Sequence, residues 1–184
     1  DHSLALQSDG TVVGWGRNWD GQTAAPLSAS NLVSIAAGWA HSLALRADGT
    51  VVGWGRNDYG QADGVRAGSN VVAIAAGYYH SLALRADGTV IAWGHDGQPS
   101  NQPVWPTNVV AIAAGYASSL GLQADGTVVG WGVEPYARTN IPPGLSNVVA
   151  VAAGDHRNLA LRADGTVVAW GSVGGSSVPK GLSD

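Results

Sequence analysis

The sequence contains no cysteine, no methionine and no phenylalanine, and only 12% of its 184 residues are charged. Without cysteine, the chain has no disulfide framework and no thiolate that could bind a metal or act as a nucleophile, and the redox compartment is left open. The formal net charge is −4, and lysine and arginine form no run, which argues against a nucleic-acid groove or an anionic membrane surface. No apolar run approaches the roughly 20 residues that a membrane-spanning helix needs.

The sequence is built on a repeat, with no apolar pattern of helical period. Asp-Gly pairs begin at Asp9, Asp48, Asp87, Asp125 and Asp164, with spacings of 39, 39, 38 and 39 residues. Five tryptophans follow the same spacing: Trp15, Trp54, Trp93, Trp131 and Trp170. A period of this length is typical of arrays whose units stack to bury their apolar faces. We expect one domain over residues 1–184, with repeats at about 1–30, 31–69, 70–107, 108–146 and 147–184.

One unit, residues 70–94, reads NVVAIAAGYYHSLALRADGTVIAWG. Its segments VVAIAAG, SLALRA and TVIAWG are rich in β-branched or alternating apolar residues and predict three strands. Asp87-Gly88 predicts a tight type I′ hairpin between the second and third strands. Because a period near forty made of short strands is typical of a propeller, we predict an all-β propeller. Its blades should be four-stranded and antiparallel, with the fourth strand in the variable segment after the Trp-Gly pair.

The sequence begins and ends in the middle of a repeat. Asp1-His2 aligns with Tyr79-His80, so the first unit has no first strand. A propeller that is not closed exposes sheet edges, which favour aggregation or pairing with another chain. We therefore expect part of a larger propeller; a self-contained ring of five blades and a homo-oligomer paired through open blade edges are the alternatives.

The order of these motifs resembles the regulator of chromosome condensation repeat family. The elements VVAIAAG, His-Ser-Leu-Ala-Leu, Asp-Gly-Thr-Val-Val-x-Trp-Gly and Arg-Asn-x-x-Gly-Gln recur in this order over nearly the whole chain. Connecting segments such as residues 140–146 are similar to the bacterial branch, which includes propeller-type inhibitors of β-lactamase. The resemblance implies a propeller, usually of seven blades. It selects no function, because the family includes exchange factors for a small GTPase, ubiquitin-ligase modules and inhibitors.

The strand directions separate two faces. The turn after each first strand and the segment after each Trp-Gly pair are expected on one end of the blades, face A, and the near-identical Asp-Gly-Thr turns on the other, face B. Loops on a rigid β scaffold often carry binding, and Trp and Tyr dominate interface energy. Face A is therefore the predicted partner-binding surface, although the same aromatic residues could simply line the inner wall of the ring. Its residues are Trp19, Trp39, Tyr59, Tyr78, Tyr79, Tyr116, Tyr136, Asp155 and His156.

Residues that recur in most units are interpreted as structural. A ligand contact would not need repeating in every blade, so the five tryptophans are expected in the core or between blades. His2, His41 and His80 share one repeat position, which favours a structural hydrogen bond over catalysis or metal binding. Asn18 and Asn57 are expected to bond the backbone of their own loops.

The predicted function is a non-catalytic protein-binding module or scaffold, inhibitor-like in its use of face A, with no metal and no cofactor. A carbohydrate-binding or carbohydrate-cleaving propeller is the main alternative, because exposed Trp and Tyr also stack on sugars. Carboxylates on face A are scattered one to a repeat, at Asp20, Asp58, Asp96, Glu134 and Asp155, which disfavours an enzyme. A guanine-nucleotide exchange factor is a further alternative, although no loop forms an inserted wedge.

Overall fold

A computed structural model describes residues 1–95, 106–132 and 140–171 of the chain. These residues form fourteen strands and one short 3-10 helix, so the prediction of an all-β propeller with almost no helix is confirmed. The elements are β1 (His2–Leu6), β2 (Val12–Gly16), β3 (Leu32–Ala37), β4 (His41–Arg46), β5 (Val51–Gly55), η1 (Gly64–Ala67), β6 (Val71–Ala76), β7 (His80–Arg85), β8 (Val90–Gly94), β9 (Val109–Ala114), β10 (Ser118–Gln123), β11 (Val128–Gly132), β12 (Val148–Ala153), β13 (Arg157–Arg162) and β14 (Val167–Gly171).

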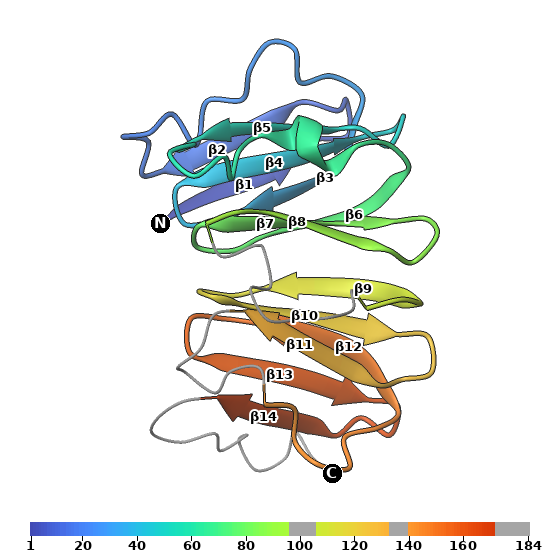
Figure 1. Cartoon of the computed structure of the whole chain (residues 1–184). Helices are drawn as coiled ribbons and strands as arrows, with labels where there is room; N and C mark the ends of the chain where they lie inside the picture. Colours follow the sequence, from blue (N-terminus) through green and yellow to red (C-terminus); the bar gives the residue numbers. More distant parts are fainter. Residues whose placement is uncertain (96–105, 133–139, 172–184) are drawn as a thin grey trace.

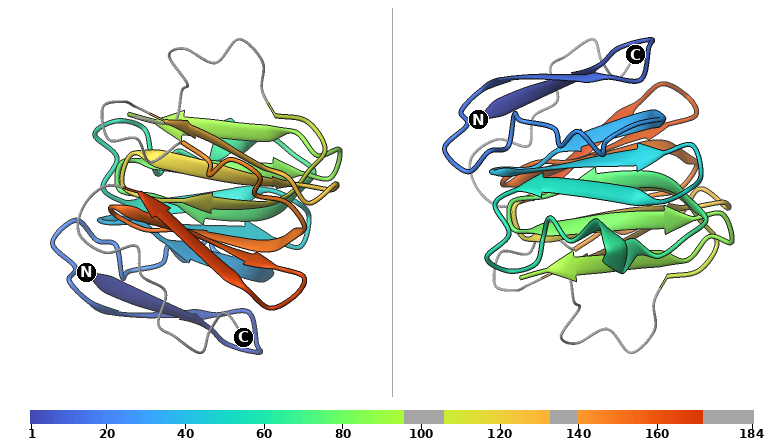
Figure 2. Two further views of the ribbon diagram at one scale, coloured as in Figure 1. Left: turned by 90° about the horizontal axis from the view of Figure 1, so that it is seen from below. Right: turned by 90° about the horizontal axis from the view of Figure 1, so that it is seen from above.

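Each repeat forms one antiparallel sheet. The first sheet pairs β1 with β2, and the next four have the orders β3-β4-β5, β6-β7-β8, β9-β10-β11 and β12-β13-β14. The sheets follow one another in an arc, with the first and last at opposite ends (Figure 1). The Asp-Gly turns gather at the right-hand end of the sheets in both views of Figure 2, and the turns after the first strands at the left. These two ends are the faces B and A expected from the strand directions, while the number of blades in a closed ring stays a prediction.

The Asp-Gly hairpins differ from the predicted type I′ turn. A type I′ turn needs positive φ at both central residues, but in the second repeat only Gly49, with φ of 78°, has it, and Asp48 does not. The Gly49 amide donates to the Arg46 carbonyl at 3.0 Å. The Asp48 carboxylate accepts from the Thr50 amide at 2.9 Å and the Thr50 hydroxyl at 2.7 Å. This carboxylate therefore stabilises a three-residue loop that ends in a left-handed glycine, and the hydrogen bonds hold the pKa of Asp48 below its usual value.

The predicted fourth strand of each blade is absent from the described residues, where no sheet has more than three strands. In the second repeat the segment after the Trp-Gly pair runs beside β5, so closely that a Cβ on Gly53 would collide with the carbonyl of Ala62. The segment then turns into η1 instead of continuing a ladder. The fourth position of the blade is therefore occupied by irregular backbone.

The core lies between successive sheets. One cluster joins Leu43 and Leu45 of β4 to Val71, Ala83 and Trp93 of the next repeat. Each unit therefore needs its neighbour to bury its apolar face, as expected of a repeat array.

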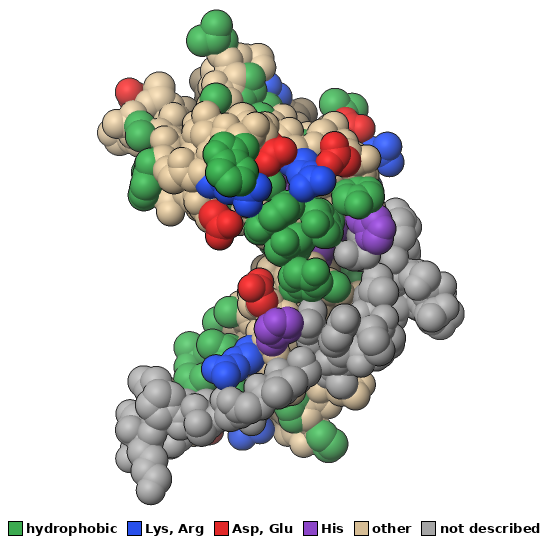
Figure 3. Space-filling view, turned by 90° about the vertical axis from the view of Figure 1, so that its left-hand side faces the viewer, with side chains coloured by type: hydrophobic (Ala, Val, Ile, Leu, Met, Phe, Trp, Pro, Cys, Tyr) green, Lys and Arg blue, Asp and Glu red, His purple; other side chains and the backbone are tan. Residues whose placement is uncertain are grey.

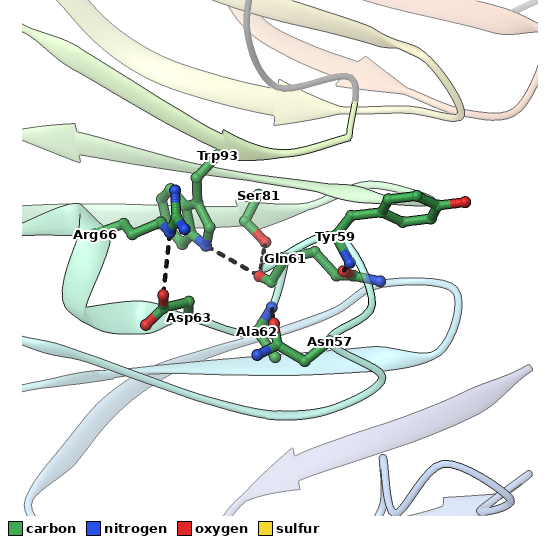
Figure 4. Close-up of polar contacts among 8 residues, drawn as sticks. All are labelled: Asn57, Tyr59, Gln61, Ala62, Asp63, Arg66, Ser81 and Trp93. Carbon is green, nitrogen blue, oxygen red and sulfur yellow. Dashed lines mark hydrogen bonds and ion pairs between the residues drawn. The ribbon is translucent and has the colours of Figure 1, made fainter.

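Four of the five repeating tryptophans pack as predicted: Trp54, Trp93, Trp131 and Trp170 are only 2–7% exposed. The Trp54 indole donates to the Gln22 carbonyl of the preceding repeat at 2.8 Å, and Trp93 donates to the Gln61 carbonyl at 3.0 Å (Figure 4). The prediction is wrong for Trp15, which is 54% exposed. Among the described residues no preceding repeat covers that side of the first sheet.

The shared histidines form hydrogen bonds between blades. His41 Nε2 lies 2.9 Å from the Ser81 hydroxyl of the next repeat, and Ser81 donates its one proton to the Gln61 carbonyl at 2.8 Å. His41 must therefore donate through Nε2, which requires the neutral tautomer protonated there. Burial, with smaller contributions from His80 and His2, lowers the pKa of His41 to about 3. The histidine is thus neutral at ordinary pH and serves as a fixed inter-blade donor.

Candidate functional site

The predicted binding residues of face A come together, apart from Tyr136, which lies outside the described residues. Rings from the second to the fifth repeat contact one another, and Trp19 of the first repeat joins them through the Arg17 guanidinium, which lies over both Trp19 and Trp39. We call this band the aromatic strip. It consists of Trp19, Trp39, Tyr59, Tyr78, Tyr79, His95, Tyr116 and His156. Figure 3 looks onto this face and shows hydrophobic side chains gathered beside arginine, aspartate and histidine.

The turns after the first strands place the strip. Trp39 donates its backbone amide to the Gly77 carbonyl of the next repeat at 3.2 Å, and Tyr78 donates to the Gly115 carbonyl at 3.1 Å. Such close approach requires a residue without a side chain: a Cβ on Gly77 would lie 2.5 Å from the Gly115 carbonyl oxygen and would collide with the His80 ring. The Ala-Ala-Gly ending of the first strand therefore fixes the aromatic residue that follows it.

One stack runs along the arc from repeat to repeat. The Trp39 and Tyr78 rings are parallel within 11°, with centroids 4.4 Å apart. Tyr78 contacts Tyr116 at 4.4 Å, and Tyr116 stacks with His156 at 6.4 Å. Aromatic pairs at such distances add about 0.5–1.5 kcal/mol each beyond the burial of their area. The stack is therefore preorganised by its own contacts.

A second row lies beside the stack. Tyr79 contacts Tyr78 at 4.4 Å and Tyr59 at 5.3 Å, in both cases edge to face. Tyr59 in turn lies 4.5 Å from the His95 ring. This row widens the strip over the second and third repeats. Among the Trp and Tyr side chains of the whole aromatic strip, Tyr59 and Trp19 are the most exposed, at 45% and 85%.

Two arginines belong to the site and were missed by the sequence analysis. The Arg17 guanidinium lies 4.3 Å from the Trp19 ring centroid and 5.0 Å from that of Trp39. Arg56 lies 5.4 Å from Trp39 and 5.8 Å from Tyr79. The signal that could have found them is their position directly after the Trp-Gly pair, which places them on face A.

The inner side of the strip borders a cavity of about 260 Å³. Its wall is formed by the ends of β3, β6, β9 and β12 together with Trp39, Tyr78 and Asp155. Asp155 follows Gly154 as Tyr78 follows Gly77, so a carboxylate replaces an aromatic ring at this repeat position. Partial desolvation raises the pKa of Tyr78, and Tyr79, Tyr116 and Asp155 add to the shift. A phenol is protonated at neutral pH even at its usual pKa, so Tyr78 can donate a hydrogen bond, and the raised pKa extends this to higher pH.

The described residues show no constellation for metal chemistry, since they contain no group of three His, Asp or Glu side chains that could hold an ion. Asp96 and Glu134, two of the five carboxylates expected on face A, lie outside the described residues. In the same described part of the chain there is no helix long and apolar enough to cross a membrane.

Comparison with known proteins identifies the repeat. The regulator of chromosome condensation (RCC1) repeat matches residues 32–61, 71–98 and 148–174. No curated protein matches the chain in sequence.

Among solved structures, yeast RCC1 (Prp20), bound to Kap60, is 24% identical to this chain, with a TM-score of 0.75. The match covers 92% of this chain and 54% of the yeast chain. The ectodomain of the Physcomitrella patens receptor kinase CR4 is 24% identical with a TM-score of 0.76, covering 97% and 52%. Human WBSCR16 is 23% identical with a TM-score of 0.74, covering 92% and 59%. The chain thus spans little more than half the length of these structures, and the likeness shows the propeller fold.

Proposed function

We propose that this chain, which contains repeats of the RCC1 family, binds a protein partner through the aromatic strip of face A and catalyses no reaction. The observation that carries the proposal is the stack from Trp39 through Tyr78 to Tyr116, which three successive blades hold in place. Rings fixed before binding lose little conformational entropy on docking. Tyr, Trp and Arg are also the side chains that most often dominate protein interfaces.

The ring geometry favours a protein over a sugar. Sugar rings stack on open aromatic faces, but the Trp39 ring already carries Tyr78 and the guanidinium groups of Arg17 and Arg56. Tyr78 is likewise packed against Trp39, Tyr79 and Tyr116. The strip therefore presents ring edges, hydroxyl groups and guanidinium groups to a partner. Trp19 alone among these is largely open, and one ring is a small platform for an oligosaccharide.

One structural relative has protein partners in keeping with this proposal. Yeast RCC1 (Prp20) has been solved with Kap60, and its binding to Gsp1p and histones has been studied. Two more specific functions stay predictions: exchange activity on a small GTPase, and inhibition like that of the bacterial β-lactamase inhibitors. Self-association through open blade edges also stays a prediction.

The test compares which protein partners are retained by three immobilised chains. The first is the unmodified chain, and the second carries Trp39→Ala, Tyr78→Ala and Tyr116→Ala. The third carries Val33→Ser, Val72→Ser and Val110→Ser, which alter equally exposed valines, each 55% exposed, at the face B end of the same first strands.

A partner retained by the unmodified chain and the valine variant but lost by the aromatic variant supports the proposal. Circular dichroism and thermal unfolding verify that all three chains are folded. Equal retention by the folded aromatic variant would show that the strip is not the binding surface.

A further inference from the structure

Two loops on face A have the same backbone design, and this makes their differences informative. In the first repeat the Asn18 carboxamide oxygen accepts from the Thr23 amide at 2.9 Å, and in the second the Asn57 oxygen accepts from the Ala62 amide at 2.8 Å. Gln22 and Gln61 likewise each accept a backbone amide two residues before them at 2.9 Å. Figure 4 shows the second loop. The side chains of Arg17 and Arg56 therefore project from equivalent positions of equivalent loops.

The two arginines differ in how their charge is balanced. Asp58, two residues after Arg56, accepts from Arg56 Nε at 2.6 Å. The residue two after Arg17 is Trp19, whose ring lies against the Arg17 guanidinium instead. The first loop has thus replaced the neutralising carboxylate with an aromatic wall.

Arg17 keeps hydrogen-bonding capacity that the described residues do not use. Its Nε is buried without a hydrogen-bond partner among them, so a carboxylate would reach the guanidinium at the Nη atoms of a side chain that is 24% exposed. Its one ion pair there is a 3.6 Å contact from Nη1 to Asp1, a side chain that is 68% exposed. Trp19 and Trp39 contact the guanidinium and limit its motion. An arginine oriented by aromatic rings matches the planar, two-oxygen geometry of a carboxylate better than a lysine would.

We infer that Arg17, held between Trp19 and Trp39, is the anchor for a carboxylate of the partner. The inference rests on the proposed function, since it names the chemistry that the partner brings to the N-terminal end of the aromatic strip. The carboxylate comes from an aspartate or glutamate side chain or from a chain terminus. Arg56 does not fill this role, because Asp58 already occupies it.

The test uses three short peptides and the ¹⁵Nε–¹H resonances of arginine side chains in the whole chain. Acetyl-Gly-Glu-Gly-amide carries a side-chain carboxylate, acetyl-Gly-Gly-Gly a terminal carboxylate, and acetyl-Gly-Gln-Gly-amide none. We expect a shift of the Arg17 resonance that grows with the concentration of one or both carboxylate peptides and no such shift with the neutral peptide. Which of the first two binds more tightly identifies the source of the carboxylate.

Variants then assign the effect. Arg17→Gln, and Trp19→Asp, which copies the second loop, should each weaken binding of the carboxylate peptide by up to about fivefold, the upper end for a solvent-accessible ion pair. Arg56→Gln should have a smaller effect, and Arg66→Gln, at an arginine outside the strip, none. A neutral peptide that binds equally well, an absent shift, or an Arg17→Gln variant that binds like the unmodified chain would overturn the inference.

The two proposals fail separately. If the carboxylate peptide binds at Arg17 but the aromatic variant retains every captured partner, the proposed function is wrong and the carboxylate site stands. If the captured partner is lost with the aromatic variant but binds Arg17→Gln unchanged, the strip is the interface and the role of Arg17 is wrong.

Discussion

The Trp39 and Tyr78 rings lie parallel, with centroids 4.4 Å apart, although they come from different blades. The contact ties the binding surface to the packing of the blades, so changes in the strip should register in stability as well. Trp39→Ala should lower the free energy of unfolding by about 1–3 kcal/mol, because it removes a half-buried indole and its ring contacts. Trp19→Ala, at a side chain that is 85% exposed, should change it by less than about 0.5 kcal/mol. Urea unfolding measures both, and a reversed order would contradict the described stack.

The glycine before each turn gives a prediction with a control inside the chain. Gly77→Ala would bring a Cβ to 2.5 Å from the Gly115 carbonyl oxygen and into the His80 ring, and should cost about 1–3 kcal/mol as an overpacking change. Gly154→Ala occupies the same repeat position, but its Cβ would meet only the Arg157 carbonyl at 3.5 Å. Thermal unfolding should therefore distinguish the two variants. Equal melting temperatures would show that the turns approach less closely than described.

The depressed pKa of His41 predicts a loss of stability in acid. Its pKa falls from the usual 6.5 to about 3 in the folded chain, so between these values the unfolded state binds the proton and the folded state does not. The His41 contribution is thus constant above about pH 6.5 and is lost progressively as the pH falls towards 3, by about 1–3 kcal/mol at pH 4. Urea midpoints at pH 7 and pH 4 measure this loss.

The control for this prediction is His41→Ser, which copies the residue at the same position of the fourth repeat, Ser118. Without the buried imidazole, the difference between the two pH values should shrink. An unchanged difference would mean that other groups cause the acid sensitivity.

The tryptophans at one repeat position should differ in how much each contributes to the free energy of unfolding. Trp54→Ala removes a buried ring and its hydrogen bond to the Gln22 carbonyl, and should cost about 3–5 kcal/mol. Trp15→Ala removes a ring that is 54% exposed, and should cost less than about 1 kcal/mol. Chemical denaturation of the two variants provides the comparison. A large effect of Trp15→Ala would show that its ring is covered in solution.

Much of the fold could be predicted from the sequence because the repeat makes the pattern redundant. The Asp-Gly pairs and tryptophans alone locate the hairpins and third strands of all five units. The replacement of the predicted fourth strand by irregular backbone could not be predicted, because the conformation of the segment after each Trp-Gly pair depends on the next blade. The Gln61 carbonyl accepts from Trp93 and Ser81 of the following repeat, and the Gln61 side chain folds back onto the Tyr59 amide. That backbone therefore binds the next blade and adds no rung to its own sheet.

The candidate site was predictable in its residues and not in its contacts. Strand direction was enough to place Trp39, Tyr78 and Tyr116 on face A. The arginines were passed over because Arg17 and Arg56 recur within a repeated loop, and recurrence is typical of scaffold. Their role depends on Trp39, which a different repeat supplies, and only the packing of the blades reveals that proximity.

Hydroxyl-radical footprinting of the chain with a captured partner tests the central claim most directly, because tryptophan, tyrosine and histidine side chains report their own solvent exposure without mutation. The aromatic strip predicts that Trp39, Tyr78 and Tyr116 lose reactivity in the complex, while Trp15, exposed at the end of the arc, keeps its reactivity. Protection of Trp15 with unchanged labelling of the three strip residues would contradict the account and place the partner on the end of the arc.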